Sequence, residues 1–140
     1  MLIETLKILF DRDLKQLRSE IESYQDEQNL WKTDKQITNS AGNLCLHIIG
    51  NLNWFIGAQL GQTSYRRNRE AELTLTNVPK KDLLIALDNT RTVVLETLDQ
   101  LTQEQLKMDY PIDVFNQKMT TSYFLVHLTT HLAYHLGQVN

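Results

Sequence analysis

Histidines are the residues of this chain with the clearest capacity for chemistry. His127, His131 and His135 follow one another at steps of four residues near the end of the sequence. On an α-helix each step is about 6 Å of rise and roughly 40° of rotation, so the three imidazoles form one stripe. His47 lies inside another apolar helical pattern. Two histidines four residues apart can bind one metal ion, and a third ligand from a facing helix would complete an open site of the kind found with catalytic metals.

The spacing also allows plainer interpretations. A histidine on an apolar helix commonly packs in the core with a satisfied ring, and three in a row can form a hydrogen-bonded stack or face solvent. His127 and His135 are about 12 Å apart along the helix axis, too far to share one ion. The spacing therefore predicts that a bound metal uses His131 with either His127 or His135, and it leaves that choice open.

Four segments with a 3.6-residue apolar period must position these histidines. The predicted helices cover residues 2–25, 40–60, 77–101 and 120–140, the last opening at Thr120 or Thr121. Helices of about this length, each with one apolar stripe, satisfy one another as a four-helix bundle. The expected fold class is therefore all-α, and bundle cores are places where metal sites are built from facing helices.

Several residues predict where the helices begin and end. Asn39 or Ser40 can cap the second helix, and Gly61 is its expected stop. Asn77 is the expected cap of the third helix, with Pro79 in its first turn.

The connections are predicted as loops. Residues 26–37 are anchored by the indole of Trp31, and residues 102–119 hold a short extended or hairpin segment over 112–115. Residues 62–77 could span about 50 Å when extended, against about 30 Å for a twenty-residue helix. A full-length crossover with parallel second and third helices is thus allowed, although the linker does not require it.

The crossover contains the cationic run Tyr65-Arg66-Arg67-Asn68-Arg69. Such a run could contact phosphate or an acidic partner. Acidic residues adjoin it and the chain carries a net charge of −3, so we interpret it as a solvated loop.

Composition limits the class of protein. A chain of 140 residues is expected to form a single domain over 1–140, and its net charge of −3 gives no field for nucleic acid. Its apolar runs are far shorter than the ~20 residues that cross a bilayer, so we expect no membrane partner. We predict no signal peptide, because an early acid and no cleavage signature follow Met1. Cys45 is a lone cysteine, which agrees with a cytoplasmic location.

Two motifs resemble the DinB-like superfamily. The first is Asn39-Ser40-Ala41-Gly42-Asn43-Leu44-Cys45-Leu46-His47-Ile48-Ile49-Gly50-Asn51-Leu52, and the second is His131-Leu-Ala-Tyr-His135-Leu-Gly137-Gln138. The similarity covers nearly the whole chain in helix order and is closest to a branch of small bacterial proteins. It implies an up-down-down-up four-helix bundle with a long crossover, often a homodimer, with one divalent metal on three histidines.

The resemblance also implies which histidines are ligands. By position they are His47, His131 and His135, since the pair in the family stands just before Gly-Gln. His127 then becomes an extra histidine one turn away, which we interpret as packing or hydrogen bonding in the cavity. Relatives in this branch usually continue with a basic, aromatic tail, whereas this sequence stops at Asn140.

Four residues near these histidines are candidates for a role in the site. Asn51 and Trp54 share the helix face of His47, and Asn51 could equally bond a ligand or form a helix-crossing amide. Cys45 should point away from that face, as a small buried apolar residue. Tyr134 is interpreted as a packing aromatic rather than a catalytic hydroxyl.

Two functions of different classes follow from these residues and the resemblance. The first is a metal-dependent thiol S-transferase, in which a bacillithiol- or glutathione-type thiol attacks a small electrophile. No carboxylate stands at an obvious general-base position, which weakens a hydrolase interpretation. The second is a non-catalytic, stress-linked metal-binding or dimerisation module. Imidazoles suit zinc, nickel, copper and iron alike, and we expect zinc or nickel.

Overall fold

The structure is a computed structural model that describes residues 1–34 and 39–139, and this part of the chain is all-α. Its long helices are α1 (Leu2–Glu22), α2 (Ala41–Leu52), α5 (Lys80–Gln100) and α7 (Thr121–Val139). No strand occurs among the described residues, where isolated bridges pair Asp109 with Thr120 and Val114 with Gln117. None of the described helices has the length and apolar character needed to cross a bilayer.

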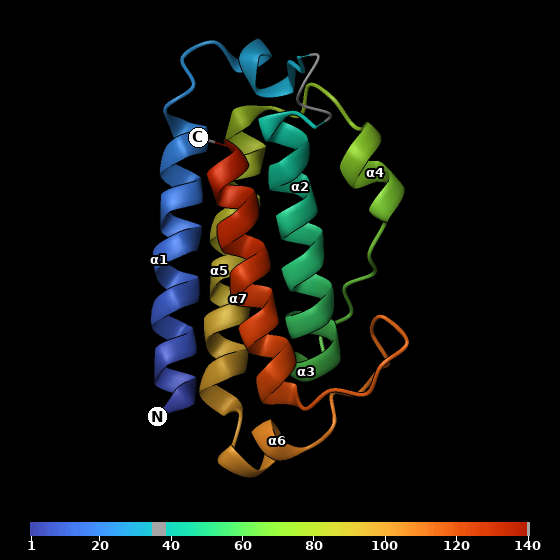
Figure 1. Cartoon of the computed structure of the whole chain (residues 1–140). Coiled ribbons are helices and arrows are strands. Elements are labelled where there is room, and N and C mark those ends of the chain that lie inside the picture. Colours follow the sequence, from blue (N-terminus) through green and yellow to red (C-terminus); the bar gives the residue numbers. More distant parts are fainter. Residues whose placement is uncertain (35–38, 140) are drawn as a thin grey trace.

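The long helices lie side by side along most of their length. Helix α1 packs against α5 and α7, and α2 packs against the same two helices. In Figure 1, α1 and α7 run in one direction while α2 and α5 run in the other, so the α2–α5 connection returns along the molecule. The apolar stripes meet between them, led by the fully buried Phe10, Leu17, Ile48, Val94 and Phe124.

The second predicted helix is not uniform. Ser40 caps it as expected, its Oγ accepting a hydrogen bond from the Asn43 amide at 3.1 Å. After Leu52 the chain enters a π-helix, η2 (Asn53–Ala58), and ends in the single turn α3 (Gln59–Gly61). The π-helix places more residues in each turn than an α-helix does, so it changes which side chains face α7.

The helix ends at Gly61, as predicted, but Gly61 itself is not left-handed. The left-handed residue is Gln62, with φ 60°. Gly61 is instead required for close packing, because a Cβ there would lie 2.5 Å from Thr97 Oγ1 on α5.

The predicted cap of the third helix is also wrong. Asn77 lies in the left-handed region, with φ 60°, and Pro79 is the N-cap residue of α5. A distant side chain serves the helix end instead: Glu27 Oε1 accepts a hydrogen bond from the Lys80 amide at 2.7 Å. An acidic side chain is favourable there because the first amides of a helix lack partners within it.

Each predicted loop contains a short helix. The first holds the 3₁₀-helix η1 (Glu27–Trp31), and the indole of Trp31 covers Gly42. Residues 35–38 lie outside the described residues. The crossover holds α4 (Arg69–Thr74), and the last connection holds α6 (Gln103–Lys107) with a capping box. The predicted hairpin over 112–115 is a tight turn, in which Val114 bridges Gln117.

Candidate metal centre

The structure brings three of the histidines together between α2 and α7. His47 comes from α2, and His131 and His135 come from successive turns of α7. One ring nitrogen from each lies within 4.8 Å of the others. Because the two helices pack against each other, residues 84 positions apart in sequence meet at one point.

The nitrogen spacing fits a metal ion. Nε2 of His131 lies 3.2 Å from Nε2 of His47 and 3.0 Å from Nε2 of His135. Metal–nitrogen bonds of about 2.0–2.1 Å at tetrahedral angles place two ligand nitrogens about 3.3 Å apart. The three rings therefore already hold nearly the separation that one four-coordinate ion requires.

Hydrogen bonds on the far side of two rings direct the lone pairs inward. His47 Nδ1 lies 3.1 Å from Glu72 Oε1, and His135 Nδ1 lies 2.7 Å from Gln138 Oε1. Ionised carboxylate and amide oxygens only accept, so each Nδ1 carries the proton and each Nε2 presents a lone pair. His131 Nε2 can donate to only one of its two neighbours, so a cation at the centre would satisfy all three nitrogens better.

Burial favours the neutral form of the two imidazoles on α7, those of His131 and His135. It lowers the pKa of His131 to about 4, with further lowering from repulsion by His135 and His47. Burial also lowers the pKa of His135, although the hydrogen bond with Gln138 opposes the shift. Metal ligands must be unprotonated, so the lowered pKa of each of these two imidazoles favours the form that binds metal.

A carboxylate stands behind His47, which the sequence did not reveal. Glu72 on α4 is buried and accepts hydrogen bonds from Arg67 Nε at 2.8 Å and Arg67 Nη2 at 3.0 Å. Burial opposes ionisation of Glu72, but its bonds with His47 and Arg67 outweigh this, and the pKa of Glu72 lies below its ordinary value. A carboxylate behind a ligand histidine orients the ring and strengthens its basicity.

Helix α4 is fastened to α2 by an amide as well. Asn43 Nδ2 donates to the carbonyl oxygens of Glu72, at 3.0 Å, and Leu75, at 2.8 Å. Ser40 Oγ donates to Asn43 Oδ1 at 2.6 Å, which fixes the orientation of the amide. The start of α2 therefore positions the crossover helix, and the crossover helix positions Glu72 beside His47.

Arg67 corrects the interpretation of the cationic run as a solvated loop. Its side chain is only 6% exposed, paired with Glu72, and its guanidinium lies 5.6 Å above the Phe55 ring. Arg66 and Arg69 are exposed, as predicted for the run. Asn68 caps α4 by accepting from the Ala71 amide at 3.0 Å, and this capping residue was a signal in the sequence for a helix that carries Glu72.

The other candidate residues lie outside the cluster. His127 packs one turn from His131, stacked on Phe124 with ring centroids 5.9 Å apart. Cys45 is fully buried, as predicted, and burial raises the pKa of its thiol to about 12, so it is inert at neutral pH. Tyr134 is exposed rather than packed in the core, and its ring meets the edge of His135.

A cavity of about 620 Å³ opens beside the histidines. His47 and His131 form part of its wall, whereas His135 does not. The remaining wall combines the polar or charged side chains of Asn51, His127, Arg67, Arg69 and Asp113 with apolar and aromatic side chains from α7, from η2 and from residues 112–115. Any open coordination position on the His47–His131 side would face this cavity.

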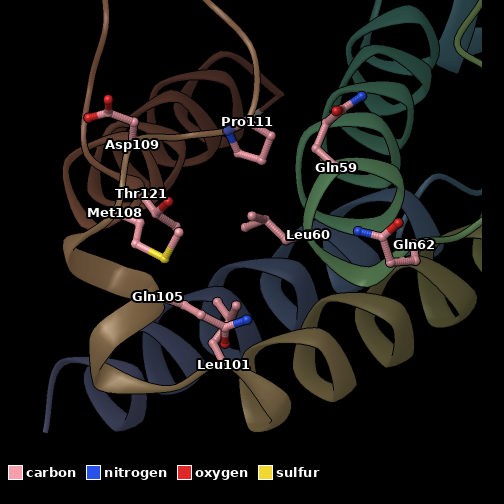
Figure 2. A pocket seen from close by; sticks show the side chains of 9 residues that line it. All are labelled: Gln59, Leu60, Gln62, Leu101, Gln105, Met108, Asp109, Pro111 and Thr121. Carbon is pink, nitrogen blue, oxygen red and sulfur yellow. The ribbon is translucent and has the colours of Figure 1, made fainter.

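A second hollow lies at the far end of the molecule and carries no comparable chemistry. It measures about 170 Å³ and lies between α3, α6 and the start of α7. Figure 2 shows Gln59, Leu60 and Gln62 on one side of it and Gln105 and Met108 on the other. Amide and thioether side chains give no ligand set like that of the three histidines.

The family of the chain follows from a comparison of its sequence with known proteins. No curated protein matches the chain. The family described as protein of unknown function (DUF1572) matches residues 2–140, which is nearly the whole length. The histidine cluster, the crossover carboxylate and the cavity all lie within that match, and the chain belongs to the DUF1572 family.

Proposed function

We propose that this protein binds one divalent metal ion on His47, His131 and His135. The observation that carries the proposal is the convergence of three Nε2 atoms at 3.0 and 3.2 Å around His131. The lowered pKa of His131 and the Glu72 carboxylate behind His47 support it. Three imidazoles and one or more open positions are typical of catalytic sites, and zinc or nickel suits this ligand set.

The arrangement of the long helices belongs to the same proposal. We infer that α1, α2, α5 and α7 form an up-down-down-up four-helix bundle of the DinB-like type, with α4 lying on the long crossover. The helix directions in Figure 1 and the two motifs around His47 and His131 support this placement.

The activity that we propose is thiol transfer to a small electrophile. A divalent ion bound at such a site supplies Lewis acidity that lowers the pKa of a thiol. The residues of the chain hold the ion, and the cavity beside His47 and His131 gives a thiol and an electrophile room to meet. Glu72 is already bonded to Arg67 and His47, so it positions His47 rather than abstracting a proton from water.

Elemental analysis and a turnover screen test these proposals in order. Protein purified without a histidine tag should contain about one equivalent of zinc or nickel per chain. Metal-loaded protein is then incubated with bacillithiol- or glutathione-type thiols and small electrophiles, and loss of free thiol is followed. Full metal content without any turnover would favour the alternative, a non-catalytic metal-binding or dimerisation module.

We also propose that the chain forms a homodimer. Helix α7 carries a row of exposed apolar side chains on its outer face, with Tyr123 64% and Tyr134 65% exposed and Val126 between them. These three residues and the exposed Thr130 lie on one side of the helix, so they form a mainly apolar surface that association would cover.

A further inference from the structure

The cavity beside the histidines is built in layers along α2 and α7. These helices run in opposite directions. A residue four positions later on α2 and a residue four positions earlier on α7 therefore both lie about 6 Å further along the cavity. From the metal centre downward, the facing pairs are His47 with His131, Asn51 with His127, and Phe55 with Phe124.

The middle layer offers polar groups that the protein leaves unused. Asn51 is only 6% exposed, and its side-chain amide makes no hydrogen bond to any residue within 1–34 or 39–139. No buried side-chain nitrogen or oxygen among the described residues lacks a hydrogen-bond partner, so the unpaired amide of Asn51 is accessible from the cavity that it lines, where a ligand can reach it. His127 faces the same space, its ring held by Phe124 and Phe115 rather than by a hydrogen bond with the described residues.

The lower layer is mostly apolar and aromatic, although Asp113 also lines the cavity and the Arg67 guanidinium lies over the Phe55 ring. The rings of Phe55 and Phe124 meet edge to face with centroids 5.1 Å apart, and Trp54 and Val114 extend the same wall. Such a surface gains most from a ligand that covers it with an aromatic or branched apolar group. The cavity volume of about 620 Å³ lies within the usual range for small-molecule sites, roughly 300–1,000 Å³.

We propose that this cavity binds an elongated small molecule made of three parts in order. One end carries a metal-binding donor and lies at the histidines. An amide or similar hydrogen-bonding group lies opposite Asn51 and His127. An aromatic or branched apolar group lies against Phe55 and Phe124. Only the position of the donor end rests on the proposed metal function, because the two lower layers exist in the protein itself.

A matched pair of probes tests the three-part ligand. N-benzoylglycine hydroxamate has a chelating end, an amide and a phenyl ring, and N-acetylglycine hydroxamate lacks only the ring. Calorimetric titration of the zinc-loaded protein should show at least tenfold tighter binding of the benzoyl probe. Asn51→Leu should weaken that probe about tenfold by leaving its amide unpaired, whereas Asn89→Leu, the same replacement at an exposed position of α5, should leave it unchanged.

A third probe separates the cavity from the metal. N-benzoylglycine amide cannot chelate, and it should still change the tryptophan emission of chelator-treated protein, an effect that Trp54→Phe should remove. Equal affinity for the two hydroxamates would overturn the inference while leaving the metal proposal intact. Failure to bind zinc, with retained binding of the uncharged amide, would overturn the metal proposal and the donor end of the ligand while supporting the two lower layers. Loss of both would overturn both.

Discussion

The carboxylate of Glu72 occupies the space that a side chain on Gly50 would need. A Cβ at residue 50 would lie 1.8 Å from Glu72 Oε2, far inside any real contact. Gly50 stands one turn after His47 on α2, so the missing side chain opens a path for the carboxylate to the ring. Helix α4 approaches α2 this closely because the residue beneath Glu72 is glycine.

Gly50→Ala should therefore displace Glu72 and destabilise the protein. The added methyl group forces the buried Glu72–Arg67 pair apart, and overpacking of this kind costs about 1–3 kcal/mol. Chemical denaturation measures the loss in the free energy of unfolding. Gly137→Ala is the control, because a Cβ there meets nothing within 4 Å and the replacement should stabilise α7 by up to about 1 kcal/mol. Equal behaviour of the two variants would contradict the steric role of Gly50.

Glu72→Gln should weaken metal binding without abolishing it. The amide can still accept from His47, but it loses the negative charge that strengthens the imidazole and pairs with Arg67. Loss of a carboxylate behind a ligand histidine typically costs about 10–100-fold in metal affinity. Competition with a chromophoric chelator measures this change. Glu70→Gln, on the exposed side of α4, should match the unaltered protein. An affinity unchanged by Glu72→Gln would mean that Glu72 serves only to hold Arg67.

Single replacements of the histidines should distinguish the two registers that the spacing allows on α7. His47→Ala, His131→Ala and His135→Ala should each abolish stoichiometric metal, because each removes one of only three ligands. His127→Ala should retain it, since this ring packs on Phe124 outside the cluster. Elemental analysis of the four variants shows which of them retain the metal. Metal lost with His127→Ala and kept with His135→Ala would place the site one turn away.

Much of this arrangement can be predicted from the sequence, because periodicity governs the long helices. Apolar residues at 3.6-residue intervals predicted α1, α2, α5 and α7, since helices bury such stripes. The residues at which the helices begin and end were harder to predict. Asn77 resembles a cap, yet Glu27 provides the acceptor for α5 from fifty-three residues away, and local sequence does not reveal that contact.

Of the candidate site, only the three clustered histidines could be predicted from the sequence. Histidines four residues apart and the DinB-like motifs singled out His47, His131 and His135. Glu72 was not predicted, and Arg67 was interpreted as part of a solvated loop, because both lie in a polar crossover that resembles such a loop in composition. Their burial comes from the glycine at position 50 and the amide of Asn43, which are tertiary contacts with another helix.

The metal-free protein should lose stability as the pH falls below neutrality. An unfolded histidine has a pKa of about 6.5, whereas the folded pKa of His131 is lowered to about 4. Above pH 6.5 or so neither state binds the proton; between about 6.5 and 4 only the unfolded state does, so acid favours unfolding in that window. Denaturation of chelator-treated protein at pH 7.5 and pH 5 measures the slope. His131→Gln should reduce this dependence of stability on pH. An unchanged dependence in that variant would mean that other groups cause it.

Stabilisation by metal should disappear as acid is added. Protons compete with the ion for the same nitrogens, and an ion bound only by the folded chain stabilises it according to its saturation. The difference in melting temperature between metal-loaded and chelator-treated protein should be clear at pH 7.5 and shrink toward pH 4, where His131 becomes protonated. An equal difference at both values would mean that something other than these imidazoles holds the ion.

The oligomeric state should depend on the outer face of α7. Light scattering at micromolar concentration should give twice the mass of one chain. Val126→Glu would place a charge in the middle of the apolar row between Tyr123 and Tyr134 and should yield monomers. Ile85→Glu, at an exposed position on α5, is the matched control. A monomer in the unaltered protein would contradict the proposal directly.

The π-helix η2 separates the histidine cluster from the aromatic wall of the cavity, so an insertion or deletion within η2 affects these two parts differently. His47 lies before η2, while Trp54 and Phe55 lie within it and line the cavity. A π-turn commonly arises from one residue inserted into an α-helix, and removing one residue rotates the remainder of the helix by about 100°. Loss of a single residue after Asn53 would thus leave the three ligands in register and turn the aromatic wall. Among related chains, insertions and deletions here would change what the cavity accepts without changing what the histidines hold.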